Sequence, residues 1–218
     1  MKLTDIPFIL TIMEQEALKC NAPVFKVEKA KRTSFELLVF VLLSARTRDE
    51  TTLKAVERLF RIAHTPQKIA ELQVSKLETI LYGVGFYRTK ARNLIKMSRM
   101  IDGQFKGVVP QTIEELLTLP GIGRKSANIV LASHFGKEVI GVDTHVHRIS
   151  NRLAWVKTKK PLETENELMK VIPKQYLRTM NKLFVAYGQT ICQPISPLCS
   201  ICKLKETYCP QVGVKKSR

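Results

Sequence analysis

Apolar residues recur along this chain at the spacing of one helix face. The clearest runs are Leu53, Val56, Leu59 and Phe60, and then Leu94, Ile95, Met97, Met100 and Ile101. Such a period of about 3.6 residues is typical of amphipathic helices. No alternating pattern of useful length predicts a strand. The pattern therefore predicts an all-α protein of about ten helices.

Five short motifs mark expected helix starts. Each has a serine or threonine as N-cap, followed either by proline or, three positions later, by glutamate. These motifs are Thr33–Glu36, Thr65–Pro66, Ser75–Glu78, Thr112–Glu115 and Thr164–Glu167. We expect a helix to begin directly after the first residue of each motif, because its side-chain oxygen accepts a hydrogen bond from an otherwise unpaired backbone N–H.

The charge balance points to an anionic partner. The 218 residues include 36 Lys and Arg against 19 Asp and Glu, a formal net charge of +17. This excess favours nucleic acid or an anionic membrane, and a solvated basic surface is the plainer alternative. The longest apolar stretch, Leu37–Leu43, is far too short to span a bilayer. Acidic residues near the N-terminus argue against a signal peptide, so we expect the protein to stay in the compartment where it is made.

The segment Glu114–Phe135 has the form of a helix-hairpin-helix. Pro120 ends the first helix, and Gly121 and Gly123 allow positive φ and close approach of another backbone. We expect the second helix to begin near Arg124. Its unpaired N–H groups would then face the turn and bind a phosphate. A plain helical connector is the alternative.

Lys125 lies in the first turn of that second helix. A lysine there opposes the helix dipole, which prefers anions at the N-terminal end. The residues alone leave two interpretations open. Lys125 is either a phosphate-binding lysine or a nucleophile whose neutral form is favoured by the dipole, by Arg124 and by partial burial. A neutral amine can attack a sugar carbon and form a Schiff base.

Asp143 precedes an expected helix, Thr144–Trp155, and is well placed to be its N-cap. A carboxylate near a lysine could also stabilise a cationic sugar transition state. The two histidines that follow, His145 and His147, are two positions apart and so point to different sides of the helix. This arrangement argues against a zinc site there.

Four of the five cysteines cluster near the C-terminus with the spacing C-x6-C-x2-C-x6-C. They are Cys192, Cys199, Cys202 and Cys209. Four thiolates this close can enclose one metal centre. Zinc and an iron–sulfur cluster both stay open, although the long outer spacers differ from common zinc-ribbon pairs. We expect the fifth cysteine, Cys20, to be a buried structural thiol.

Two motifs together resemble the endonuclease III family of DNA glycosylases. They are LPGIGRK at Leu119–Lys125 and VDTHV at Val142–Val146. The resemblance extends from about Thr33 to Cys209. It implies two helical domains with a DNA cleft between them. One is a helix-hairpin-helix multi-helix domain, residues 25–138, and the other is an iron–sulfur-cluster helical domain, residues 1–24 and 139–218.

The resemblance also implies roles for individual residues. The family's catalytic lysine falls on Lys125 and its catalytic aspartate on Asp143. Related adenine and mismatch glycosylases lack a lysine at that position. Lys125 therefore implies a bifunctional enzyme that excises oxidised pyrimidines through a Schiff base and cuts the strand by β-elimination. The four clustered cysteines are the implied ligands of one [4Fe–4S] cluster, although their last spacer, Lys203–Tyr208, is one residue longer than is usual in the family.

Further DNA contacts are expected on three segments. The hairpin contributes Leu119, Gly121, Ile122, Gly123 and Arg124. In the turn after Ser44, Arg46 stands where the family often has glutamine, and we expect both residues to meet DNA, with Arg46 contacting the orphaned base. A surface arginine paired with Asp49 or Glu50 is the alternative. Because the cysteine loop Gln193–Leu198 is uncharged, we expect Lys203 and Lys205 to meet phosphates in its place.

The expected partner is double-stranded DNA that contains damaged pyrimidines or abasic sites. We expect a monomer without membrane contact, cytoplasmic and associated with the nucleoid, or nuclear in a eukaryote. Two other functions stay open: a mismatch-type glycosylase acting on G:T or G:U pairs, and a non-catalytic iron–sulfur DNA-binding protein.

Overall fold

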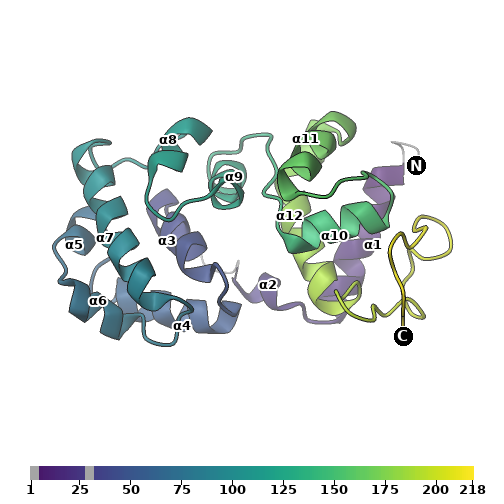
Figure 1. Cartoon of the computed structure of the whole chain (residues 1–218), viewed down its shortest axis with the longest axis horizontal. Coiled ribbons are helices and arrows are strands. Elements are labelled where there is room, and N and C mark those ends of the chain that lie inside the picture. Colours follow the sequence, from purple (N-terminus) through teal and green to yellow (C-terminus); the bar gives the residue numbers. More distant parts are fainter. Residues whose placement is uncertain (1–4, 28–31) are drawn as a thin grey trace. The chain divides into compact units, whose positions relative to one another are not determined.

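The computed structural model describes residues 5–27 and 32–218, and Figure 1 shows their arrangement. Twelve α-helices and no strand occur in these residues, which confirms the predicted all-α class. The chain divides into two compact units, one formed by Met1–Lys29 with Gly136–Arg218 and the other by Ala30–Phe135. None of the described helices combines the length and the apolar character needed to cross a membrane.

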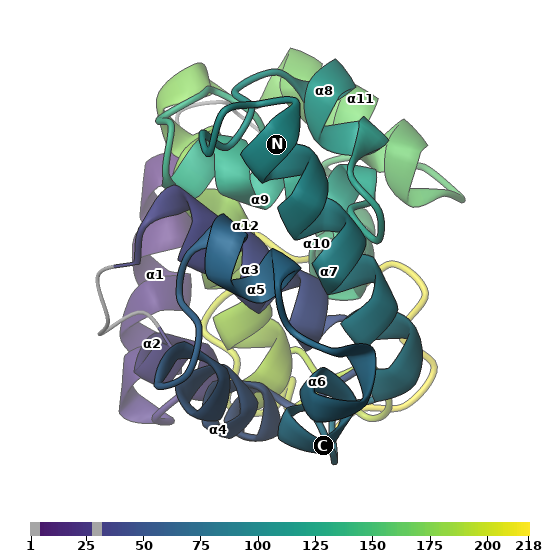
Figure 2. The ribbon, with the colours of Figure 1, turned by 90° about the vertical axis from the view of Figure 1, so that its left-hand side faces the viewer.

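The unit Ala30–Phe135 is organised around one strongly apolar helix, α3 (Figure 2). Its described residues form α3 (Ser34–Ser44), α4 (Asp49–Phe60), α5 (Pro66–Ala70), α6 (Val74–Ile80), α7 (Tyr87–Gly103), α8 (Ile113–Thr118) and α9 (Arg124–Ser133). Helix α3 packs against α4, α7 and α9. Because neighbours cover it on several sides, Phe35 and every residue from Leu38 to Leu43 are buried.

The unit that holds both ends of the chain is organised around its longest helix, α12. Its helices are α1 (Ile6–Lys19), α2 (Pro23–Val27), α10 (Thr144–Arg152), α11 (Pro161–Val171) and α12 (Lys174–Thr190). Helix α12 packs against α1, α2 and α10. Phe184 and Tyr187 lie in this core, and the Phe184 ring is 5.6 Å from that of Trp155. After α12 the chain continues without further helices, and this last segment carries the four clustered cysteines (yellow in Figure 1).

Three of the five predicted N-caps are confirmed. Thr33 forms a reciprocal capping box: its hydroxyl accepts from the Glu36 amide at 3.2 Å, and the Glu36 carboxylate accepts from the Thr33 amide at 2.9 Å. Thr65 caps α5 through the Lys68 amide, and Thr112 caps α8 through an equivalent bond. These helix starts were predictable because the whole motif is local in sequence.

The other two predicted caps are wrong. Helix α6 begins at Val74, so Ser75 already lies inside it. Helix α11 begins at Pro161, because a proline suits the first helical position and fixes an earlier start. The carboxylate of Glu163 accepts the amides that precede this helix. Thr164 is instead buried inside α11, where its hydroxyl lies 2.6 Å from His147 Nδ1.

Candidate active site and cysteine cluster

The glycine hairpin joins α8 to α9 as the sequence predicts. Helix α8 ends at Thr118 and α9 begins at Arg124. Gly121 has φ +85°, and a Cβ there would lie 3.0 Å from Asn93 Nδ2 and 3.2 Å from Leu42 Cδ1. Only glycine meets both conditions without strain. Gly123, which also permits positive φ, instead has φ −99° as the N-cap of α9.

The hairpin divides into buried anchors and an exposed edge. Leu119 and Ile122 are only 2% and 6% exposed, so their side chains hold the turn to the unit's core. Gly121, Gly123 and Arg124 are exposed. A ligand at this edge would therefore meet backbone groups and the Arg124 side chain, and neither of the two apolar side chains.

Lys125 is the second residue of α9 and is half-buried. The first backbone hydrogen bond of this helix runs from the Ala127 amide to the Gly123 carbonyl at 3.0 Å. The amides before Ala127 therefore have no intrahelical acceptor, and their positive ends lie beside Lys125. The N-terminal end of the α9 dipole therefore lies next to the Lys125 side chain.

Asp143 is the N-cap of α10, as its sequence position predicts. Its Oδ1 accepts hydrogen bonds from the amides of His145 at 2.8 Å and Val146 at 2.9 Å. Both amides use the same oxygen, and the residue is half-buried. The second carboxylate oxygen keeps its capacity for a further hydrogen bond or a nearby positive charge. Asp143 can therefore act as the N-cap and still take part in chemistry.

Lys125 and Asp143 belong to different units of the structure.

A half-buried arginine connects the start of α10 to the cysteine segment. Arg148 Nη2 lies 3.1 Å from His145 Nδ1 and donates to the carbonyl of Cys192 at 2.8 Å. Because a guanidinium can only donate, His145 Nδ1 accepts, and the proton of a neutral imidazole then lies on Nε2. Burial lowers the pKa of Arg148, and the nearby Cys192 and Asp143 oppose this shift.

The four clustered cysteines line one pocket in the unit that holds the chain ends. Their pocket neighbours are largely apolar, among them Ile149, Leu153, Ile191 and Leu204. Burial raises the pKa of the Cys209 thiol to about 11 and raises that of Cys199 as well. These two thiols therefore hold their protons unless a cation binds them.

Polar side chains contact these sulfurs directly. Arg152 Nη1 donates to Cys192 Sγ at 3.3 Å, and the Tyr187 hydroxyl lies 3.1 Å from Cys202 Sγ. Burial strongly raises the pKa of Tyr187, so its hydroxyl keeps the proton and is able to donate to a Cys202 thiolate. Hydrogen bonds to sulfur of this kind stabilise thiolate ligands. In the described part of the chain, no three His, Cys, Asp or Glu side chains form a group suited to a metal ion.

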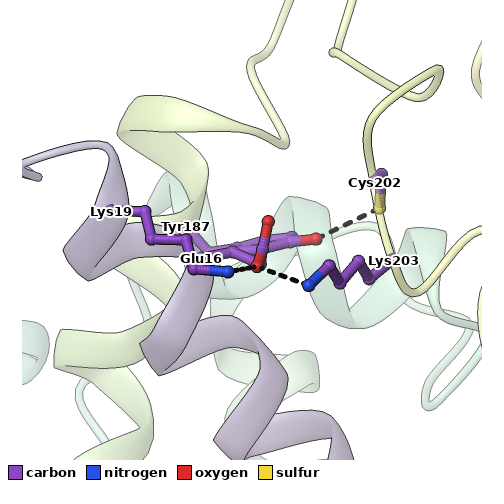
Figure 3. Close-up of polar contacts among 5 residues, drawn as sticks. All are labelled: Glu16, Lys19, Tyr187, Cys202 and Lys203. Carbon is purple, nitrogen blue, oxygen red and sulfur yellow. Dashed lines mark hydrogen bonds and ion pairs between the residues drawn. The ribbon is translucent and has the colours of Figure 1, made fainter.

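The two lysines expected to meet phosphates differ in their surroundings. Lys203 follows Cys202, and its Nζ lies 3.2 Å from Glu16 Oε1, which also pairs with Lys19 at 3.0 Å (Figure 3). Together the two lysines lower the pKa of Glu16. Lys205 is exposed at the edge of the cysteine pocket. The expectation that Cys20 is buried is wrong, because its thiol is exposed at the end of α1.

Arg46 occupies an exposed turn directly after α3. Its backbone has φ +52°, and its guanidinium lies 5.8 Å from the centre of the Phe86 ring. The Ser44 hydroxyl donates to the Val41 carbonyl at 3.1 Å and so helps to end α3. Sequence reasoning missed Phe86, which is 64% exposed and also has positive φ, 56°. The available signal was an aromatic residue directly after the glycine turn Gly83–Gly85.

Comparison with known proteins identifies the family of this chain. The family model described as HhH-GPD superfamily base excision DNA repair protein matches residues 39–174 of this chain. Endonuclease III of Thermotoga maritima is 47% identical over 171 residues, 78% of this chain and 80% of that protein. A non-covalent endonuclease III–DNA complex has a TM-score of 0.84 at 35% identity, covering 97% of this chain and 96% of that one. A trapped endonuclease III–DNA covalent intermediate has a TM-score of 0.82 at 36% identity, covering 94% of each chain.

The all-α fold, the glycine hairpin and the match to the family model together place this chain in a class of proteins: the helix-hairpin-helix proteins of base excision DNA repair. With this identity and coverage, the chain belongs to the endonuclease III family. Its activity is that of a bifunctional DNA glycosylase and AP lyase, and its partner is DNA. Members of the family generally carry a [4Fe–4S] cluster.

Proposed function

We propose that the protein excises oxidised pyrimidines from duplex DNA, with Lys125 as the nucleophile and Asp143 as the stabilising carboxylate. The observation that carries this proposal is a half-buried lysine at the N-terminal turn of α9, directly after a glycine hairpin. A similar protein has been trapped as a covalent intermediate on DNA, and a lysine amine can form such a bond. In this proposal the protein acts as a monomer.

The reaction begins when the neutral amine of Lys125 bonds to C1′ of the damaged nucleotide. The bond from C1′ to the base breaks, and the base leaves with the electron pair and takes up a proton. The negative charge of Asp143 stabilises the positive charge that develops on the sugar, and the carboxylate helps to deprotonate the amine. Only the uncharged amine has the electron pair that this attack needs.

Strand cutting follows from the same bond. Opening of the sugar ring, with transfer of the amine proton to the ring oxygen, leaves a Schiff base between Lys125 and C1′. Loss of a proton from C2′ then expels the 3′ phosphate by β-elimination. Water hydrolyses the imine and returns the free lysine. One residue therefore serves both the glycosylase and the lyase activity.

Contacts to the DNA backbone would hold the nucleotide in place. The exposed edge of the hairpin offers the N-terminal end of α9 and the Arg124 side chain to a phosphate. Lys205, which is exposed, would meet a second phosphate. Lys203 would do so only by exchanging its ion pair with Glu16 for one with the phosphate.

Extrusion of the damaged base leaves a gap in the duplex. We propose that Arg46 enters this gap and contacts the orphaned base, and that Ser44 lies at the edge of the same contact. An exposed turn with an arginine beside an exposed aromatic ring supports this assignment. Guanidinium and aromatic groups both stack well on bases.

The four clustered cysteines would hold a single [4Fe–4S] cluster, which when bound would cross-link the C-terminal segment through its own four cysteine side chains. Four thiols around one apolar pocket are the donor set that such a cluster requires. Cys192→Ser should lower iron and sulfide content, whereas Cys20→Ser, an exposed thiol outside the pocket, should leave both unchanged.

The substrate assignment is tested with a panel of matched duplexes. They would carry thymine glycol, uracil opposite guanine, or thymine opposite guanine, and single-turnover excision would be measured on each. We expect the fastest excision from thymine glycol. Faster excision from either mismatch would assign the protein to the mismatch-type glycosylases, and binding without excision on all three would overturn the enzymatic proposal.

A further inference from the structure

Two loops of the unit Ala30–Phe135 meet directly beside Arg46. One is the turn Ala45–Thr47 after α3, and the other is the glycine loop that leads into α7. The Gly85 amide donates to Thr47 Oγ1 at 3.1 Å. A Cβ on Gly85 would lie 2.6 Å from the Arg46 carbonyl oxygen, so the contact leaves no room for a side chain. The position of one loop therefore fixes the position of the other.

Lys90, near the start of α7, reaches under the Arg46 turn from inside the unit. Its side chain is buried, with only 7% of the residue exposed. Its Nζ donates to the Leu43 carbonyl at 2.7 Å, the Ala45 carbonyl at 2.6 Å and Thr47 Oγ1 at 3.0 Å. An ammonium group has three N–H donors, and these three acceptors match that number.

The position of these acceptors explains why a charged group is buried here. The Leu43 carbonyl is one of the last four carbonyls of α3. These carbonyls accept no hydrogen bond from within the helix, and they form the negative end of the helix dipole. A cation at this end is stabilised by the dipole. Burial nevertheless lowers the pKa of Lys90 to about 8, which leaves the ammonium form dominant at neutral pH.

The bonds from Lys90 fall on both sides of Arg46. Ala45 precedes Arg46 and Thr47 follows it, and both are held by the same ammonium group. Arg46 itself is exposed and has positive φ, a conformation that costs a non-glycine residue free energy. The clamp from Lys90 holds this strained residue in one backbone conformation and keeps its guanidinium near Phe86.

We propose that Lys90 is a positioning residue for lesion recognition: it clamps the turn Ala45–Thr47 and so presents Arg46 to the damaged duplex in a single conformation. This inference rests on the proposed function, in which Arg46 contacts the orphaned base. Lys90 is enclosed by its own unit, so it acts through Arg46 and does not touch DNA.

The test is Lys90→Met, which keeps a long apolar side chain and removes the three donors. Lys96→Met, an exposed lysine of the same helix, is the matched control for the lost charge. Affinity is measured for a duplex with a tetrahydrofuran abasic analogue and for the undamaged duplex of the same sequence. In Lys90→Met we expect the affinity for the abasic-analogue duplex, relative to that for the undamaged duplex, to fall about tenfold, because small errors of position weaken such contacts strongly. In the control this ratio should stay at the wild-type value.

A double-mutant cycle with Arg46→Ala separates positioning from general stability. If Lys90 acts through Arg46, the double variant loses no more lesion preference than Arg46→Ala alone. Independent, multiplying losses would overturn the inference, as would an unchanged affinity ratio in Lys90→Met. Should Lys90→Met fail to fold, Gly85→Ala disturbs the same turn from the other loop and must give the same loss. Wild-type protein that is never trapped on abasic DNA by borohydride would instead refute the proposed function, whatever the affinity ratios are.

Discussion

Arg152 Nη1 donates a hydrogen bond to Cys192 Sγ over 3.3 Å. The same guanidinium donates to the carbonyls of Gln193 and Pro194 at 2.7 and 2.9 Å. The backbone carbonyl of Arg152 in turn accepts from the Val212 amide. Arg152 therefore holds both ends of the cysteine segment. Because α10 begins after Asp143 and ends at Arg152, the proposed catalytic carboxylate and the proposed cluster are attached to opposite ends of one nine-residue helix.

Arg152→Met should weaken this attachment. The substitution leaves two carbonyls without their donor and removes the positive charge beside Cys192. We expect the free energy of unfolding to fall by about 1–3 kcal/mol, the usual range for the loss of hydrogen bonds to a charged group, and the iron content per protein to fall with it. Arg178→Met, at an exposed arginine of α12, is the control. Chemical denaturation and iron analysis would measure both effects, and an Arg152→Met protein with wild-type values of both would contradict the role given to this arginine.

Asp143 has two roles that substitutions can separate. Asp143→Asn keeps an N-cap side chain, whereas Asp143→Ala loses it and should cost about 1 kcal/mol of stability. Both variants lack the negative charge. We therefore expect Asp143→Asn to unfold like the wild type and yet to excise the base at least about 100-fold more slowly, as for loss of a proton-transfer group. Single-turnover kinetics beside urea denaturation would measure this, and a fast Asp143→Asn variant would reduce Asp143 to a structural cap.

The pH dependence of stability should report on Lys90. Burial lowers its pKa in the folded state to about 8, while in the unfolded chain the group keeps its proton up to about 10.4. Between these values the unfolded chain binds more protons, so this group makes the free energy of unfolding rise with pH. Relative to Lys90→Met, the wild type should therefore gain stability from pH 8 to pH 10. Urea denaturation at several pH values would show the gain, with Lys96→Met as the reference for loss of a lysine. A difference between wild type and Lys90→Met that does not change with pH would refute the burial of this charge.

Local patterns allowed much of the fold to be predicted. Helix periodicity, the caps at Thr33 and Thr112 and the N-cap at Asp143 all depend on residues within one turn of each other. Thr164 misled the prediction because Pro161 moved the helix start by one turn. The proline is the competing signal in the sequence, and it determines the helix start more strongly than the threonine and glutamate pattern does.

The features of the site that depend on tertiary contacts could not be predicted from the sequence. Lys90 looks in sequence like any surface lysine of an amphipathic helix, and its acceptors lie more than 40 residues earlier in the chain. Phe86 could not be linked to Arg46 for the same reason. The expectation that Cys20 is buried rested on its residue type alone, yet Cys20 lies at the exposed end of α1. The cysteine spacing, in contrast, did bring all four thiols to one pocket.

The most direct test of the whole account is borohydride reduction during reaction with a duplex that carries thymine glycol. A Schiff base at Lys125 would be reduced to a stable bond, so wild-type protein should appear as a covalent protein–DNA complex, with the DNA attached to the peptide that contains Lys125. Lys125→Ala should still bind the duplex but should neither nick it nor be trapped. Trapping of Lys125→Ala at the wild-type level, or attachment to a different lysine, would contradict the account.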